Sequence, residues 1–589
     1  MTFSFYHNWT RPAIAGLCFL LALCVFKANA QQDTSGKLPI EILPSNGTRL
    51  EYITTDSGAI NKLINNVALK QGDNYMYCDS AYIDLAKNNV YAFGNVRLIQ
   101  NSGTQVQSDY LRYTGNTKRA YLKGNVSLTD GKNNLWSEEL EYNLNTKLGV
   151  YTQGGTLQSE MTTLSSNAGT YNAKTKDARF TGDVFVTDPE YNVTSVDLGY
   201  NTETKVVRFL GASVVVNDKS TLHTSSGTWD AKNEIAHFTT RSSIQNEAQY
   251  IEGDKMDYNR KTGFGIVVGN VFALDTSQKA TLYSGHAQYN EITRQLWATI
   301  KPVMKRVNGD DSLYIRADTF YAAPVPRAED SLQRKNEKVK SKKEIGKNVV
   351  ETTEVNVTDT TASDSSRPRY FIGYHHVLVY SDSLQARCDS ISYSQADSTM
   401  RLMYNPIAWS RKSQITGDTI LLYTDSNTLR KLFVPNNAFV VSQSGPEKAN
   451  MYDQVQGKTL TGFFENNAIK TMLVFPNAEA IYYSKDEADA YLGMNQATSE
   501  RMRVFFDSSQ VSKIVLEQDV KQTMTPMQQV NIATAILARF QWHAEKRPKS
   551  VQELFLYEPE GVIIPKEEGK TDREEEAPKQ KSNRKRRKR

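Results

Sequence analysis

Hydrophobic and polar residues alternate along most of the chain with a period of two. In residues 109–128, DYLRYTGNTKRAYLKGNVSL, Leu111 and Tyr113 share one face of a run, and Val126 and Leu128 share one face of the next. Side chains of a β-strand point alternately to opposite faces, so the pattern predicts half-buried strands. The intervening TGNTK has the composition of a turn.

The same pattern returns at a fixed interval. An aromatic residue, a polar turn and an alternating strand recur eight times, and the marker aromatics are Tyr82, Tyr113, Tyr142, Tyr171, Tyr200, Trp229, Tyr258 and Tyr289. Successive markers lie 31, 29, 29, 29, 29, 29 and 31 positions apart. A register kept through eight units indicates a repeat architecture, in which each unit of two strands and two turns buries its apolar face against its neighbours.

Composition divides the chain into further segments. Residues 370–525 repeat the theme in diverged form, with Asn-Pro or Pro-Asn replacing the glycine that precedes Asn-Val in the first half. Residues 322–369 are highly charged and lose the periodicity, which indicates a flexible insertion. The segments expected are a signal peptide (1–30), a linker (31–48), a first β-jellyroll (49–321), the insertion (322–369), a second β-jellyroll (370–525), a short helical segment (526–557) and a disordered basic tail (558–589).

The first thirty residues have the pattern of an export signal. A positive charge at Arg11 precedes a largely apolar stretch, and Ala28-Asn29-Ala30 fits a small-x-small cleavage site. We therefore expect cleavage near Ala30 and Gln31 and an exported protein. An uncleaved membrane anchor is the weaker alternative, because the apolar stretch is shorter than the roughly 20 residues that span a bilayer.

The positive net charge belongs to the ends of the chain. The formal charge is +5, but two basic residues lie in the signal and eight lie between Lys579 and Arg589, so the body carries −5. A basic tail is either a solubilising end or a contact to an anionic envelope surface. Nucleic acid is an improbable partner for an exported protein.

No catalytic or metal-binding constellation is present in the sequence. It contains no HExxH, CxxC pair, GxSxG elbow or phosphate loop. The histidine pair His375-His376 is expected on opposite faces of a strand, so a shared metal is improbable. Cys78 and Cys388 are expected to be two separate thiols, although an exported protein could form one disulfide between them. Neither an enzyme nor a cofactor is expected.

What remains is an apolar interior with two interpretations. It could hold an extended apolar ligand such as lipid acyl chains, by burial of apolar area at about 25 cal/mol per Å². It could instead be a filled core, which is the interpretation that periodicity alone favours. The residues predicted to face the interior are Leu111, Tyr113, Val126, Leu128, Leu140, Tyr142, Val184, Val186, Leu198 and Tyr200.

The repeated motifs resemble the OstA/LptA-like family of lipopolysaccharide-transport proteins. The residues that carry the resemblance are Ala81-Tyr82 with Phe93-Gly94-Asn95-Val96, Asp109 to Tyr113 with Gly124-Asn125-Val126, Ala168 to Tyr171 with Phe180 to Val184, and Met256 to Tyr258 with Gly269-Asn270-Val271. Each motif is degenerate, but eight in register are specific. Residues 50–320 carry the resemblance well and residues 370–520 loosely.

The resemblance implies an all-β, elongated open β-jellyroll, or solenoid of two-strand units, here as two copies in tandem. It further implies a slot for lipid A acyl chains, a location in the periplasm of a Gram-negative bacterium or at its outer membrane, and partner jellyrolls that pair through edge strands. The resulting expectation is a lipopolysaccharide-binding transport protein that bridges towards the outer membrane. The alternative is a structural β-solenoid of the cell envelope with a filled core and no catalytic activity.

Overall fold

The computed structural model describes residues 38–55, 58–308, 311–326, 367–425, 428–507 and 510–556. The predicted signal peptide, residues 31–37 of the predicted linker, most of the predicted insertion and the basic tail lie outside these residues. The chain divides into two compact units, residues 1–126 with 141–145, and residues 127–140 with 146–589. Across the residues described, neither unit contains a helix long and apolar enough to cross a membrane.

The first unit is built from β-strands. Its strands, of which the last two extend into the residues of the second unit, are β1 (Glu41–Ile42), β2 (Arg49–Thr55), β3 (Gly58–Gln71), β4 (Asn74–Asp84), β5 (Asn89–Gln100), β6 (Gln105–Thr114), β7 (Arg119–Thr129) and β8 (Asn133–Asn143). Consecutive strands from β2 to β6 pair antiparallel with their neighbours in sequence.

The second unit continues the all-β pattern, with shorter strands in its middle. Up to the charged insertion its strands are β9 (Leu148–Tyr151), β10 (Gly155–Ser159), β11 (Thr162–Ser166), β12 (Ala168–Asn172), β13 (Asp177–Thr187), β14 (Asn192–Asn201), β15 (Val206–Phe209), β16 (Ser213–Val216), β17 (Thr221–Thr224), β18 (Gly227–Asp230), β19 (Ile235–Phe238), β20 (Ser242–Gln245), β21 (Gln249–Gly253), β22 (Lys255–Asn259), β23 (Phe264–Asp275), β24 (Ala280–Asn290), β25 (Gln295–Thr299), β26 (Val303–Asn308), β27 (Asp311–Arg316) and β28 (Thr319–Pro324).

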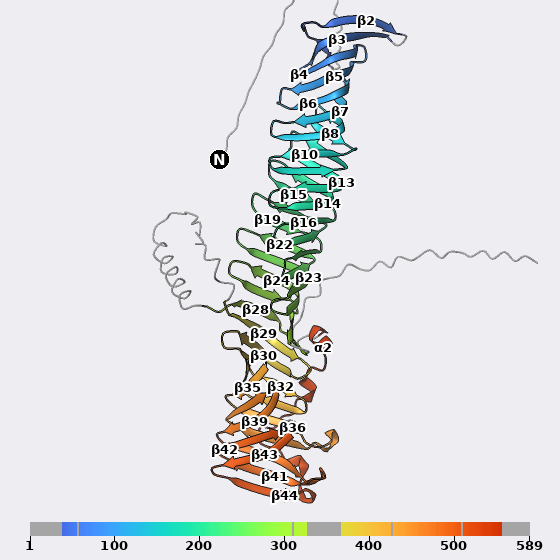
Figure 1. Cartoon of the computed structure of the whole chain (residues 1–589). Coiled ribbons are helices and arrows are strands. Elements are labelled where there is room, and N and C mark those ends of the chain that lie inside the picture. The colour runs from blue at the N-terminus through green and yellow to red at the C-terminus, as the bar shows by residue number, and fades with distance from the viewer. Residues whose placement is uncertain are drawn as a thin grey trace, which may run out of the picture. The chain divides into compact units, whose positions relative to one another are not determined.

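After the insertion the same unit carries sixteen more strands in the described residues. They are β29 (Arg369–Tyr380), β30 (Gln385–Ser394), β31 (Thr399–Met403), β32 (Ile407–Ser410), β33 (Ser413–Thr416), β34 (Thr419–Asp425), β35 (Thr428–Val434), β36 (Ala438–Gln443), β37 (Tyr452–Gly457), β38 (Thr459–Glu465), β39 (Ala468–Phe475), β40 (Ala478–Lys485), β41 (Tyr491–Ser499), β42 (Arg501–Asp507), β43 (Gln510–Glu517) and β44 (Lys521–Pro526). The expectation of an all-β repeat fold is confirmed (Figure 1).

The strands on either side of the insertion pair directly. β28 runs antiparallel to β29, with Thr319 opposite Tyr374 and Pro324 opposite Arg369. β27 also pairs with β29 through Ile315 and Val379. The two predicted tandem copies therefore share one ladder at this point, and the insertion leaves and re-enters between two hydrogen-bonded strands.

Long strands bend at a corner of two residues with positive φ. Gly94–Asn95, Gly124–Asn125, Gly182–Asp183 and Gly269–Asn270 all have φ between 44° and 79°. The pairing register shifts at these places in β5, β13 and β23. Such two-residue bulges bend the strand into two limbs. We call a limb that carries a marker aromatic, or that pairs with a limb carrying one, a marker limb. The limb on the other side of the corner is the facing limb.

The two limbs enclose the apolar interior between them. In the second unit, a Cβ placed on Gly149 of a marker limb would lie 3.3 Å from Cδ1 of Leu140 of a marker limb and 3.6 Å from Cδ1 of Leu128 of a facing limb. In the first unit, Val90 and Tyr113 of marker limbs and Leu69 and Leu98 of facing limbs line one residual space of about 20 Å³. A space of this size is close to that of a single water molecule. The interior is tightly packed there.

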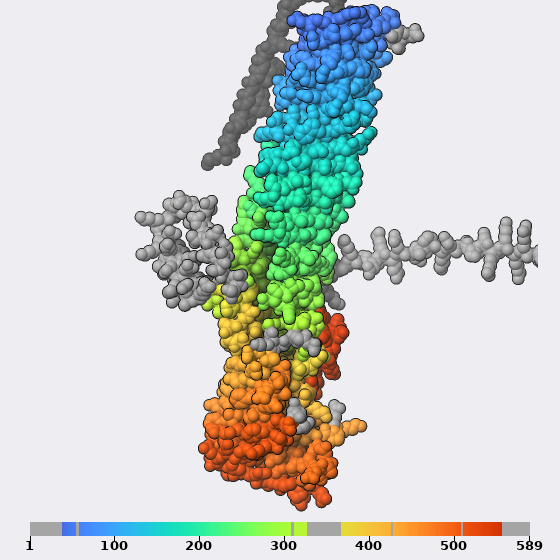
Figure 2. Space-filling model, in the orientation of Figure 1, coloured from blue at the N-terminus to red at the C-terminus, as the bar shows by residue number. Residues whose placement is uncertain are grey.

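The C-terminal segment predicted as short helical, residues 526–557, contains little helix among its described residues. It contains three-residue 3₁₀ turns at Met527–Gln529, Ile532–Thr534 and Ala544–Lys546, and α-helix only at α2 (Val551–Leu556). The apolar residues instead pack on strands: Leu537 joins a cluster with Phe439, Val441 and Ile481. Figure 2 shows this red segment against the second unit, where α2 contacts β27 and β29.

Candidate lipid-binding interior

The corners explain why the acidic residues near the marker aromatics recur. The corner asparagine donates through Nδ2 to an aspartate sixteen positions earlier, at 2.8 Å in each case: Asn95 to Asp79, Asn125 to Asp109 and Asn270 to Asp254. At Gly182–Asp183 the roles are exchanged, and Asn167 donates to Asp183 at 2.8 Å. These carboxylates therefore hold the two sides of each bend together.

A second corner position carries a hydroxyl every 29 residues. Its Oγ donates to the carbonyl oxygen two residues later, at distances of 2.8 to 3.4 Å, in Ser108, Ser137, Ser166, Ser195 and Thr224. Cys388 occupies the same setting, because its Sγ donates to the Ser390 carbonyl at 3.2 Å. Cys388 and Cys78 are both buried and free. Burial raises the pKa of each thiol to about 12.

The histidine pair also forms a corner, so the prediction that it lies on a regular strand with opposite faces is wrong. His375 and His376 have φ of 60° and 50°, and the register of β29 shifts between Tyr374 and Val377. His375 contacts Asp389 at 3.1 Å and His376 contacts Asp318 at 2.6 Å. Across the described residues, no group of three or more His, Cys, Asp or Glu side chains could hold a metal ion.

The marker tyrosines tie the two limbs together. In the first unit, the Tyr142 hydroxyl donates to Oε1 of Gln100 at 2.7 Å, and the Tyr113 hydroxyl donates to Oε1 of Gln71. The glutamines are the last residues of β5 and β3, so each bond joins a marker limb to the end of a facing limb. Burial raises the pKa of both tyrosines, which stay neutral donors.

The second unit uses charged groups for the same purpose. Asp130, in the turn after a facing limb, accepts hydrogen bonds from the Tyr171 hydroxyl and from Lys176 Nζ. Burial raises the pKa of Asp130, but these bonds and those from Asn133 outweigh it and hold the pKa well below its usual range. One repeat later, Lys205 Nζ lies 3.2 Å from a carboxylate oxygen of Glu160. We call these contacts between the limbs cross-limb bonds.

All ten residues predicted to face the interior are buried. Their exposed fractions are 0–4 %, with Leu111, Tyr113, Val126 and Tyr142 in the first unit and Leu128, Leu140, Val184, Val186, Leu198 and Tyr200 in the second. They lie where cross-limb bonds also occur. Their packing is that of a filled core, and contact with lipid remains a prediction for each of them.

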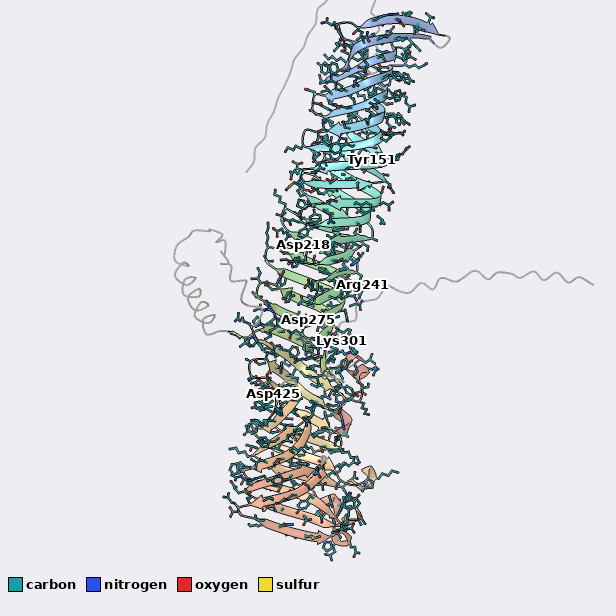
Figure 3. The ribbon with its side chains drawn as sticks, viewed as in Figure 1. Tyr151, Asp218, Arg241, Asp275, Lys301 and Asp425 are labelled. Atoms are coloured by element: carbon teal, nitrogen blue, oxygen red, sulfur yellow. The ribbon has the colours of Figure 1, made fainter. Side chains whose placement is uncertain are left out.

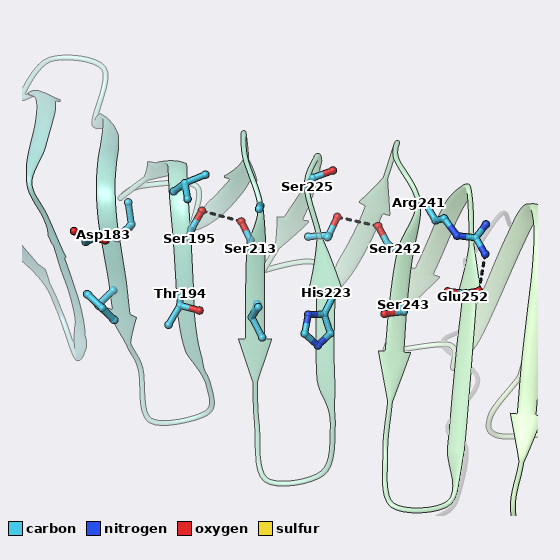
Figure 4. Close-up of a pocket in the computed structure, with 16 residues that line it drawn as sticks. Asp183, Thr194, Ser195, Ser213, His223, Ser225, Arg241, Ser242, Ser243 and Glu252 are labelled. Atoms are coloured by element: carbon cyan, nitrogen blue, oxygen red, sulfur yellow. Dashed lines mark hydrogen bonds and ion pairs between the residues drawn. The ribbon is translucent and has the colours of Figure 1, made fainter.

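A shallow pocket of about 550 Å³ lies beside the corners of the second unit (Figure 4). Ser195 and Ser213 are joined there at 2.8 Å, and Ser242 donates to Thr224 at 2.9 Å. Arg241 is neutralised by Glu252 and Asp254. Figure 3 shows Arg241 and Lys301 at corners, and Asp218 and Asp275 at turns that end facing limbs. Phe185, Val196 and Val214 also line the pocket, so its wall is partly apolar and its arginine is already paired.

Comparison with known proteins identifies one part of the chain. Residues 39–197 match the family model described as OstA-like protein. These residues are OstA-like. The resemblance that the motifs indicated is thereby confirmed, and the OstA-like stretch holds three of the four glycine-containing corners.

Solved structures similar to part of the chain include a periplasmic protein. It is LptH, described as the LptA homologous periplasmic component of the conserved lipopolysaccharide transport device from Pseudomonas aeruginosa. The identity is 14%, the TM-score is 0.20, and the match covers 24% of this chain and 95% of LptH. No curated protein matches the chain.

Proposed function

We propose that the protein is a non-enzymatic lipid carrier of the Gram-negative envelope, which holds the acyl chains of lipopolysaccharide between its two limbs. The observation that carries the proposal is the apolar interior, which both limbs enclose in one repeat after another. Residues 39–197 of the same chain are OstA-like. Export through the predicted signal peptide and a periplasmic location, with the outer membrane as destination, belong to the same proposal.

Partners at the strand edges are part of the proposal. β2 pairs with β3 along one of its sides, and it exposes Leu50 and Tyr52 at 57% and 72%. An edge strand with unpaired backbone groups can add a strand from another chain. A further jellyroll transport protein is the proposed occupant of this edge. The basic tail is the proposed contact to an anionic envelope surface.

The test of the proposal is recovery of lipid with the protein. Protein purified from its own envelope should give native mass-spectrometric peaks heavier than the polypeptide, and solvent extraction should release lipopolysaccharide. Bare polypeptide masses from gently handled membranes would overturn the proposal.

A filled-core envelope scaffold is the second candidate function. The near-complete burial of the ten interior residues, at 0–4 % exposure, favours it. The two functions differ in one outcome, because a scaffold would carry no extractable lipid and would still bind protein partners along its strand edges.

A further inference from the structure

Inward residues of the facing limbs form a single row through the second unit. Each residue stands directly opposite the next on paired strands, in the order Leu135, Leu157, Leu164, Val186, Val193, Val215, Leu222, Ile244, Ile251, Ala273 and Leu282. Every member is apolar. A ligand that lies along the interior must touch this row.

Burial changes sharply along the row. The residues from Leu135 to Val193 are only 0–4 % exposed, and Leu282 is 8% exposed. The five residues between them, Val215, Leu222, Ile244, Ile251 and Ala273, are all half-buried. Inward-facing apolar surface is therefore partly uncovered on five strands that are neighbours in the sheet, β16, β17, β20, β21 and β23.

The uncovered stretch coincides with a change in the cross-limb bonds. Before it, Lys176 and Lys205 reach Asp130 and Glu160 on facing limbs. Within it the marker Trp229 has no hydroxyl, and the hydroxyl of the marker Tyr258 donates instead to Glu291 at 2.7 Å. The exposed pair Arg260 and Glu190, at 3.5 Å, joins the turn after β22 to the turn between β13 and β14, where the row is still packed. Exposed ion pairs of this kind contribute about 0–1 kcal/mol, so this pair restrains the limbs weakly.

Contacts between the two limbs resume where the row enters the second half of the chain. Gln395 of a marker-limb end donates to Gln278 of a facing-limb turn at 3.3 Å, and Arg306 lies over the ring of Tyr393 at 5.5 Å. Met304, which joins Leu282 to Ile315 in the row, is half-buried. From there the row is packed again, with Ile315, Val379, Ala386 and Ala408 at 0–3 % exposure. Beyond them the row continues through Ile415, Val440 and Val455, which are half-buried.

We propose that lipid acyl chains occupy the two half-buried stretches of the row, around Ile244 and around Val440, and are excluded from the packed stretches before and between them. The inference rests on the proposed lipid-carrier function and adds the place of binding. The first stretch lies outside the OstA-like residues 39–197.

The dimensions and chemistry of the first stretch fit an acyl chain. Five adjacent strands about 4.8 Å apart give a row of roughly 19 Å. One leaflet of a bilayer core of about 30 Å is roughly 15 Å deep, which is the reach of one acyl chain. On the same units the marker limbs carry the apolar residues Phe209, Phe238 and Met256, each 3% exposed. An apolar wall with charges only at the rim selects acyl chains and leaves the headgroup in solvent.

Site-specific photo-crosslinking tests the placement. A benzophenone amino acid is introduced singly at Ile244 and Val440, at the packed positions Leu140 and Leu157, and at the outward neighbour Gln245, in protein expressed in its own envelope. We expect lipid adducts from Ile244 and Val440 and none from the other three. Equal adducts from Leu140 or Leu157 would leave the carrier function standing but overturn the placement, because the slot would then be continuous. Adducts at no position despite extractable lipid would overturn the placement as well, and absence of extractable lipid would overturn both.

A thiol-protection experiment covers the risk that the bulky residue disrupts the packed positions. Ile244→Cys changes a half-buried residue, and the native Cys78 and Cys388 are buried. The new thiol should react with a water-soluble maleimide in delipidated protein and several-fold more slowly after reconstitution with lipopolysaccharide. Gln245→Cys is the matched control and should react equally in both states. Equal rates for Ile244→Cys in both states would contradict the placement.

Discussion

The hydroxyl of Tyr142 donates to Oε1 of Gln100, 42 positions earlier, at 2.7 Å. Tyr142 is 1% exposed and Gln100 is 6% exposed, so the bond is shielded from water. Because a buried polar atom that loses its partner costs about 1–3 kcal/mol, such bonds fix the spacing of the limbs as well as stabilising them.

Tyr142→Phe should therefore reduce the free energy of unfolding by about 1–2 kcal/mol, since it leaves the Gln100 amide oxygen without this donor. The measurement is the shift of the urea midpoint in the part of the transition that involves the first unit. Tyr404→Phe is the matched control, because Tyr404 is 67% exposed. A Tyr142→Phe midpoint equal to that of the control would show that the bond does not hold the limbs together.

Asp130 makes the second unit acid-sensitive. Its folded-state pKa lies below the unfolded value of about 3.9, so its contribution is complete above that pH and is lost as pH falls through the folded-state pKa. Asp130→Asn should cost about 2 kcal/mol at pH 7 and flatten the dependence of stability on pH below about 4. Urea unfolding at pH 3, 5 and 7 measures both effects. The exposed turn residue Asp218, changed to Asn, should leave the profile unchanged, and an unaltered slope in Asp130→Asn would contradict the assignment.

The repeat, the inward faces and the corners were predictable to different degrees. Period-two alternation places Leu111 and Tyr113 inside, and both are buried, because alternation follows from strand geometry alone. The cross-limb partner of Tyr142 was not predictable, since a bond over 42 positions depends on how units stack. His375 and His376 were misplaced because the sequence there lacks the Gly-Asn pair that marks other corners. The 29-residue spacing of Ser or Thr from Ser108 to Thr224 was the available signal for the corner hydroxyls.

The corners should depend on glycine for two separable reasons. Gly124 has φ of +78°, and a Cβ there would lie 2.7 Å from Oδ2 of Asp109. Gly131 has φ of +90° with open space around it. Gly131→Ala should cost about 1 kcal/mol from backbone strain alone, and Gly124→Ala should cost more because it also displaces the Asp109 carboxylate. Chemical denaturation of the two variants compares them. If both variants lost the same free energy of unfolding, the hydrogen bond between Asn125 and Asp109 would contribute nothing to the stability of the bend.

The buried thiols should be inert in the folded protein. With a pKa of about 12, neither Cys78 nor Cys388 supplies appreciable thiolate at pH 8. We expect no reaction of Cys78 or Cys388 with Ellman's reagent until denaturant unfolds the chain, when both thiols react. Cys388→Ser should keep the bond to the Ser390 carbonyl and preserve stability, whereas Cys388→Val should lose it at a cost of about 1 kcal/mol. Rapid labelling of native protein would contradict the burial.

The C-terminal segment should stabilise the second half of the chain by covering apolar strand faces. Gln454, which is fully buried, donates to the Ala535 carbonyl at 2.9 Å and accepts from the Leu537 amide at 2.8 Å. Leu537, at 5% exposure, packs with Phe439 and Ile481. Leu537→Ala should cost about 2–4 kcal/mol in chemical denaturation, by lost burial and a residual cavity.

The neighbouring Ile536 gives the control for this prediction, because it is 51% exposed on the same segment. Ile536→Ala should change stability by less than about 0.5 kcal/mol. Limited proteolysis then separates local from global effects: Leu537→Ala should be cut faster at Arg539 than wild type, since loss of the anchor frees the segment from β36 and β37. If Leu537→Ala were as stable and as protease-resistant as Ile536→Ala, the segment would lie on the strands without stabilising them.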